Sequence, residues 1–163
     1  MEKIKWCCLQ KDGIKLIEPN ENISKKYFEE AGKDLIEMKM ANSLKWKDIE
    51  AYYSCYNSVY ALFQKIGIKC EIHDCTLELL KIISERVGIT KKELDLIEAL
   101  KHKRIDVQYY LKTPKEVDEK AVSDFVLSCK HILNTLNYDD IIKIRGEINK
   151  IVSMSKNEAS DRK

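Results

Sequence analysis

The stretch WKDIEAYYSCYNSVYALFQKIG, residues 46–67, decides the fold class of this chain. Its large apolar and aromatic side chains recur at steps of three and four residues, which is the spacing of one face of an α-helix. Small side chains between them would let a neighbouring backbone approach closely; these are Ala51, Ser54, Cys55, Ser58 and Ala61. We therefore expect a central helix from about Trp46 to Ile66, ended by Gly67.

Helical patterns also flank this stretch on both sides. Thr90 and Glu93 have the spacing of a capping box at the start of a helix. Thr113, Pro114 and Glu116 have the signature of a second helix start, with Thr113 as the N-cap. Together with the apolar periodicity, these signals predict helices over about residues 22–42, 74–87, 91–111, 114–136 and 138–154.

Length and composition point to one helical domain. The 163 residues are 44% hydrophobic and 34% charged, and only five are Gly and two Pro, so turn formers are scarce. We expect an all-α fold, an antiparallel four-helix bundle with additional short helices. A single domain should cover residues 1–155, followed by a polar tail over residues 156–163 that frays.

Charge and hydropathy narrow the class of protein. The formal net charge of +2 means that a nucleic-acid site would have to be a local patch. No apolar run approaches 18 residues and the N-terminus lacks the features of a signal peptide, so we expect no membrane association and a cytoplasmic location. The six cysteines are then interpreted as mostly reduced thiols.

Two kinds of site are weakly indicated. Cys70, His73 and Cys75 lie within six residues and could contribute zinc ligands, but the chain has no C-x-x-C motif. The favoured interpretation is two small core cysteines and a loop histidine, with no metal or cofactor. Nothing marks a cysteine as an activated nucleophile, and the chain contains no Gly-rich phosphate loop, G-x-S-x-G or H-E-x-x-H motif.

The densest polar cluster is KHKRIDVQYYL, residues 101–111. Helical geometry places Arg104 and Gln108 on one face, with Lys101 a turn earlier, and Asp106 and Tyr110 on another. By itself the spacing favours ordinary solvated helix surface over a partly buried functional edge. The four tyrosines of residues 46–67 are likewise interpreted as core residues rather than as residues that stack on bases.

Three stretches together resemble the HEPN family, particularly its small single-domain archaeal and bacterial members. They are YFEEAGKDLIEMKMA, WKDIEAYYSCYNSVYALFQKIGIKCEIHDC and LKHKRIDVQYYL, and the resemblance covers roughly residues 5–136. It implies a helical-bundle homodimer. Many members are metal-independent RNases of toxin–antitoxin and defence systems, in which an Arg and a His with four to six residues between them meet across the dimer interface.

The match to that motif is partial. Arg104 stands at the arginine position, whereas Tyr109, Tyr110 and Leu111 occupy the histidine window, and His102 precedes the arginine. The resemblance therefore implies the branch without the catalytic histidine: a homodimer that binds RNA or a nucleotide, partnered by a minimal nucleotidyltransferase. The expected binding residues are Arg104, Asp106, Gln108, Tyr109 and Tyr110.

Two alternatives remain. One is an active metal-independent endoribonuclease, in which Arg104, Tyr109 and Tyr110 would be the catalytic candidates and His73 a less favoured substitute for the missing histidine. The other is a structural adaptor or antitoxin-like subunit, with Arg104 and Asp106 paired at the dimer seam.

Overall fold

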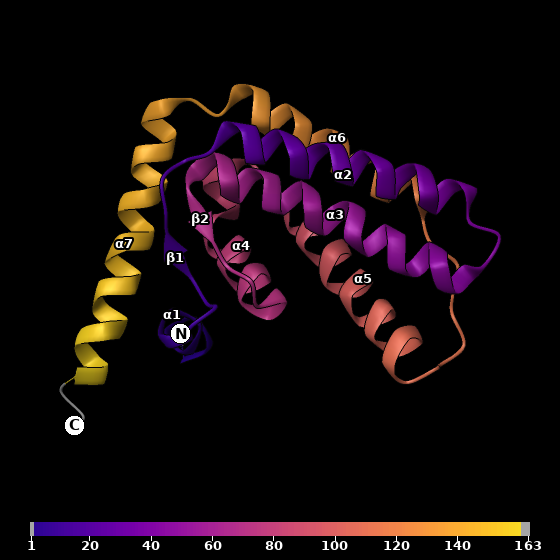
Figure 1. Ribbon diagram of the computed structural model, residues 1–163, viewed down its shortest axis with the longest axis horizontal. Helices are drawn as coiled ribbons and strands as arrows, with labels where there is room; N and C mark the ends of the chain where they lie inside the picture. Colours follow the sequence, from indigo (N-terminus) through magenta and orange to yellow (C-terminus); the bar gives the residue numbers. More distant parts are fainter. Residues whose placement is uncertain (1, 161–163) are drawn as a thin grey trace.

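The computed structural model describes residues 2–160, and within them the chain is almost entirely helical (Figure 1). The expected all-α class is confirmed. A single two-stranded antiparallel sheet within this range pairs Lys15 with Lys69 and Leu16 with Ile68. In chain order the elements are α1 (Glu2–Leu9), β1 (Lys15–Leu16), α2 (Glu21–Met40), α3 (Leu44–Ile66), β2 (Ile68–Lys69), α4 (His73–Val87), α5 (Lys91–Tyr109), α6 (Glu119–Thr135) and α7 (Tyr138–Ser160).

Helix α3 is the central element, as its sequence predicts. Most of its residues are buried, and it packs against α2, α5 and α6, which Figure 1 shows around it. Its end is set by Gly67, whose φ of 85° lies in the left-handed region that glycine adopts without a steric penalty. Burial on several sides explains why small and aromatic residues alternate along this helix.

Two serine hydroxyls join α2 to α3. Ser24 Oγ donates to the carbonyl oxygen of Ala61 at 2.8 Å, and Ser54 Oγ donates to that of Ala31 at 2.9 Å. A step of seven residues forward along α2 therefore matches seven residues backward along α3, so the two helices are antiparallel. Both serines are buried, and their short side chains let the helix backbones come close enough for these bonds.

The two predicted helix starts have different outcomes. The Thr90–Glu93 capping box is formed in both directions. The start predicted at Thr113 is wrong, because α6 begins at Glu119 and its N-cap is Asp118, whose carboxylate accepts from the Ala121 amide at 2.9 Å. Residues 113–118 form an irregular connector instead, and its path is set by Lys103, which donates to the Glu116 carbonyl oxygen.

Helix α7 closes the end of α3. The guanidinium of Arg145 donates to the carbonyl oxygens of Ile17, Ile66 and Gly67 at 2.7, 3.0 and 3.0 Å. A cation at a helix C-terminus also complements the helix dipole. The helix continues to Ser160, past the end expected near Met154, and α1 packs against it. Residues 161–163 of the expected tail lie outside the described range.

A disulfide between Cys7 and Cys75 ties α1 to α4 across 68 residues of sequence. The other four cysteines, Cys8, Cys55, Cys70 and Cys129, are buried free thiols. The interpretation of mostly reduced cysteines therefore holds for four of the six. None of the helices over residues 2–160 is long and apolar enough to cross a bilayer.

Candidate functional site

Arg104 lies at the centre of the candidate site. It belongs to α5, only 7% of its surface is exposed, and its guanidinium carbon lies 4.8 Å from the ring centre of Tyr52 and 5.6 Å from that of Tyr53. Nη1 donates to the Tyr53 hydroxyl at 3.1 Å, while the buried Nε has no hydrogen-bond partner. Aromatic faces attract a guanidinium through their quadrupoles, so α3 holds this cation in place without neutralising it.

His73, the first residue of α4, extends the same cluster. Its ring lies parallel to that of Tyr56, with centres 4.2 Å apart and planes 7° apart. Its Nδ1 lies 2.6 Å from the Tyr52 hydroxyl. Burial, and secondly the positive charge of Arg104, hold the pKa of His73 below its ordinary value. The imidazole is therefore mainly neutral at pH 7 and is fixed in orientation by two tyrosines.

An ion pair anchors α4 to α5 beside this histidine. Lys101 Nζ lies 2.7 Å from Asp74 Oδ1, and the lysine side chain is only 8% exposed. The hydrogen bond from Lys101 is the main reason that the pKa of Asp74 is lowered. This contact explains how residues 31 positions apart, His73 and Arg104, reach the same cluster, since it holds the start of α4 against α5.

The other residues expected at the site are placed differently. Asp106 pairs with Lys112 at 2.7 Å, and no ion pair or hydrogen bond among residues 2–160 joins it to Arg104. Tyr109 is 64% exposed, and its ring centre lies 5.7 Å from the guanidinium of Arg104. Gln108 is exposed, and Tyr110 is exposed with Lys112 near its ring. The structure thus brings Tyr109 to Arg104 and leaves the other three on the surface.

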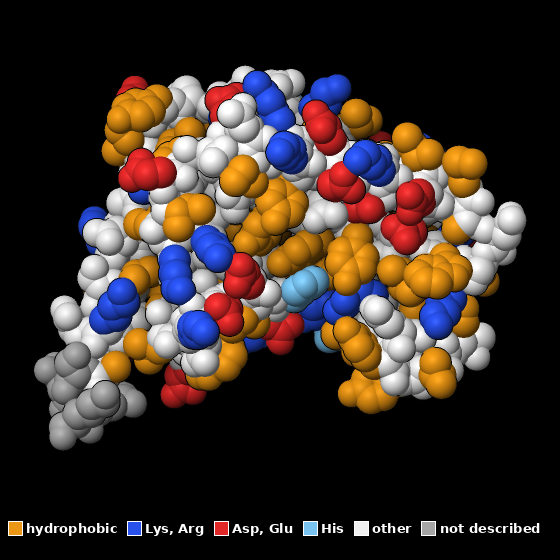
Figure 2. All heavy atoms as spheres, viewed as in Figure 1, with side chains coloured by type: hydrophobic (Ala, Val, Ile, Leu, Met, Phe, Trp, Pro, Cys, Tyr) orange, Lys and Arg blue, Asp and Glu red, His pale blue; other side chains and the backbone are white. Residues whose placement is uncertain are grey.

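The cluster has an unbalanced charge. Arg104 forms no ion pair with a carboxylate in the described part of the chain. The salt bridges of α5 there involve other residues, Lys91, Asp95, Glu98, Lys101 and Asp106. Burial raises the pKa of Tyr52 and Tyr56, and raises that of Tyr60 to about 12, so these phenols stay neutral at physiological pH. Figure 2 shows basic and histidine side chains gathered where the α4 and α5 regions meet below α3.

A zinc site at Cys70, His73 and Cys75 is not formed. Cys75 is bound to Cys7, and Cys70 Sγ faces the carbonyl oxygen of Ile72 at 3.6 Å. Over residues 2–160 no group of three or more His, Cys, Asp or Glu side chains is arranged to hold a metal ion.

The scan against protein-family models finds no match to this chain. The search of curated proteins also finds no significant relative. The geometry of the site therefore carries the functional argument.

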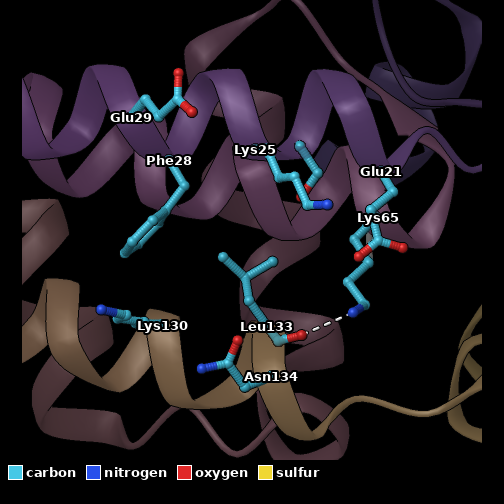
Figure 3. Close-up of a pocket in the computed structure, with 9 residues that line it drawn as sticks. Glu21, Lys25, Phe28, Glu29, Lys65, Lys130, Leu133 and Asn134 are labelled. Carbon is cyan, nitrogen blue, oxygen red and sulfur yellow. Dashed lines mark hydrogen bonds between the residues drawn. The ribbon is translucent and has the colours of Figure 1, made fainter.

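Away from the Arg104 cluster, a hollow with a volume of about 240 Å³ lies between α2 and α6 (Figure 3). Phe28 and Leu133 point into it, while Lys65 donates to the Leu133 carbonyl oxygen at 2.7 Å. The lysines on its border do not converge: Lys130 points away from the centre, and Lys25 extends toward Glu21. This hollow has no focused charge comparable to that of Arg104.

Sequence reasoning missed that Tyr52 and Tyr53 contact Arg104 and that His73 binds Tyr52. Periodicity placed either Tyr52 or Tyr53 on the buried face of α3, and the structure shows that Tyr52 is fully buried. It contained no information about which helix would face that tyrosine. One sequence signal could have found the cluster. His73 starts a helical pattern only a short connector after the end of α3, and this short separation keeps it close to α3.

Proposed function

We propose that this protein is a HEPN-like homodimer that binds RNA or a nucleotide through the surface around Arg104, as the cytoplasmic partner of a minimal nucleotidyltransferase. In this proposal α2, α3, α5 and α6 form the antiparallel four-helix bundle of that family. The observation that carries it is a buried arginine whose charge is balanced by no carboxylate among residues 2–160.

Phosphate is the ligand that best suits such a group. A guanidinium presents several N–H donors in a fixed plane and binds phosphate oxygens in pairs. Here Tyr53 accepts from one of the two Nη1 hydrogens and Tyr52 holds the plane of the group, while Nη2 makes no hydrogen bond to another residue of the described range. Tyr109 stands beside the guanidinium with an exposed ring, which suits it to stacking on a base.

The test measures RNA affinity by fluorescence anisotropy with a labelled single-stranded oligonucleotide. Wild-type protein should bind with an affinity that falls with added salt, because each phosphate contact releases counterions. Arg104→Ala should lose most of this affinity and flatten the salt dependence. Arg86→Ala is the matched control, since Arg86 is an exposed arginine paired with Glu147. The proposal is wrong if the wild-type protein binds neither RNA nor nucleotides.

The position of His73 favours one second candidate, a metal-independent endoribonuclease. A histidine held by Tyr52 and lying near Arg104 supplies the two groups that such chemistry needs. If Nδ1 donates its proton to the Tyr52 oxygen, Nε2 is free to take a proton from an RNA 2′-hydroxyl. The 2′-oxygen would then attack the adjacent phosphorus and form a 2′,3′-cyclic phosphate as the P–O5′ bond breaks. The leaving 5′-oxygen would take a proton from water, and Arg104 would stabilise the charge that develops on the phosphate oxygens.

The nuclease is tested with single-stranded RNA in EDTA. His73→Ala and Arg104→Ala should each abolish cleavage. His102→Ala should leave cleavage unchanged, because His102 is exposed and, two residues before Arg104, faces a different side of α5. Absence of cleavage by the wild type rejects this candidate and leaves the binding proposal standing. If binding is also absent and Arg104→Ala weakens dimerisation in sedimentation, the protein is a structural adaptor.

A further inference from the structure

A small pocket continues the aromatic cluster on the side away from Arg104. Four residues line it, Tyr27 of α2, Tyr56 and Tyr60 of α3, and Glu71 of the connector between β2 and α4, and its volume is about 190 Å³. Its lining is three aromatic rings and one carboxylate. Tyr56 and Tyr60 are nearly buried, so the half-buried ring of Tyr27 is the surface on which a flat ligand could stack, and Glu71 offers a hydrogen-bond acceptor at its edge.

The rings form a continuous track from this pocket toward Arg104. The ring centres of Tyr60 and Tyr56 are 5.8 Å apart, and those of Tyr56 and Tyr52 are 5.6 Å apart, with both pairs stacked. Tyr27 lies against Tyr60 with ring centres 4.7 Å apart. The guanidinium of Arg104 lies 4.8 Å beyond Tyr52. A base in the pocket would therefore lie two rings away from Arg104, which suits that cation to the phosphate of a neighbouring nucleotide in the same strand.

The carboxylate at the far end is held at the surface. Glu71 is about half exposed, its backbone N–H donates to the Asp12 carbonyl oxygen, and its side chain pairs with Lys69 at 2.9 Å. Because the backbone is anchored, the carboxylate stays at the edge of the pocket. Its two oxygens can each accept one hydrogen bond from a ligand that offers two neighbouring donors.

We propose that this pocket is a base subsite that prefers guanine. Guanine offers two adjacent N–H donors on its Watson–Crick edge, whereas adenine, cytosine and uracil each offer one donor beside an acceptor. A carboxylate therefore matches guanine with two bonds and the other bases with one. The inference rests on the proposed RNA or nucleotide binding at Arg104 and assigns its base specificity.

The experiment uses fluorescein-labelled pentaribonucleotides that differ only at the central base, UUGUU, UUAUU, UUUUU and an inosine version that lacks the 2-amino group. The full-length wild type should bind UUGUU roughly tenfold more tightly than UUAUU or UUUUU, with inosine between them. Glu71→Gln should lower the affinity for UUGUU to that for UUUUU. Glu147→Gln is the matched control, because it removes a surface carboxylate that also pairs with a cation.

A second pair of variants tests stacking. Tyr27 is half-buried, so Tyr27→Phe keeps the ring and should keep the preference, whereas Tyr27→Leu should reduce UUGUU binding roughly fivefold or more. Equal wild-type affinity for all four oligonucleotides, abolished by Arg104→Ala, would overturn the base subsite and leave the proposed function intact. Retention of the guanine preference in Glu71→Gln would also overturn it. If no oligonucleotide binds, the base subsite is wrong, and the proposed function also fails if mononucleotides do not bind.

Discussion

The hydroxyl of Tyr52 and Nδ1 of His73 lie 2.6 Å apart, and this bond joins the fully buried part of α3 to the first residue of α4. The imidazole is at the same time stacked on Tyr56. The start of α4 is thus positioned by the aromatic side chains of the central helix. Substitution of Tyr52 or His73 should therefore alter the stability of the protein as well as its function.

The lowered pKa of His73 predicts a pH dependence of stability. The unfolded histidine titrates near 6.5, and the folded one titrates below it, so the unfolded state binds more protons in this window. Stability should be fully present above about pH 6.5 and fall as the pH drops through the folded pKa. Urea midpoints at pH 7.5 and 5.0 measure this. His73→Gln should reduce the dependence, whereas His131→Gln, at an exposed position on α6, should leave it unchanged.

Arg145 should contribute strongly to stability. Arg145→Met leaves the carbonyl oxygens of Ile17, Ile66 and Gly67 without this donor, and we expect a loss of about 3 kcal/mol in the free energy of unfolding. Arg86→Met, which breaks only a surface ion pair with Glu147, should cost less than about 1 kcal/mol. Equal effects of the two substitutions in urea titrations would contradict this assignment.

The Cys7–Cys75 disulfide should make stability depend on reductant. Closing a loop across 68 residues restricts the unfolded chain, and chain-entropy reasoning puts the contribution at about 4 kcal/mol. Unfolding in dithiothreitol should therefore occur at a lower temperature than unfolding without it. A Cys7→Ser, Cys75→Ser double variant should melt at the same temperature in both conditions. A wild type that shows no difference would refute the contribution.

Among the described residues the guanidinium of Arg104 donates one hydrogen bond, to the Tyr53 hydroxyl. Tyr53→Phe should cost about 1 kcal/mol or more, because a nearly buried cation loses that acceptor. Tyr138→Phe, which changes a phenol that is 74% exposed, should leave stability unchanged. Chemical denaturation followed by circular dichroism distinguishes the two variants.

Local signals predicted the helices better than they predicted the site. The Thr90–Glu93 box was correct because both bonds lie within four residues. The Thr113 start failed because the side chain of Lys103, ten residues earlier, binds the Glu116 carbonyl oxygen, and Asp118 supplies a competing cap. Such a contact depends on where α5 ends relative to the connector, which periodicity does not encode.

The site shows the same limit. The sequence singled out Arg104 as a candidate, but the residues around it come from other helices: Tyr52 and Tyr53 contact the guanidinium, and His73 binds Tyr52. The expected neighbour Asp106, two residues away, points instead to Lys112. Residues two apart on a helix do not face each other, whereas residues from packed helices do. Spacing within one segment could therefore locate the arginine and not the residues that hold it.

The bonds from Arg145 to Ile66 and Gly67 impose an order on the maturation of the chain. The donor follows those carbonyl groups by 79 and 78 residues, so α3 is synthesised long before Arg145 exists. Until then Gly67 caps the helix and the Ile17 N–H can bind the Gly67 carbonyl oxygen, whereas the Ile66 carbonyl oxygen has to be satisfied by water. Synthesis of α7 is thus the event that completes the hydrogen bonding at the end of the central helix.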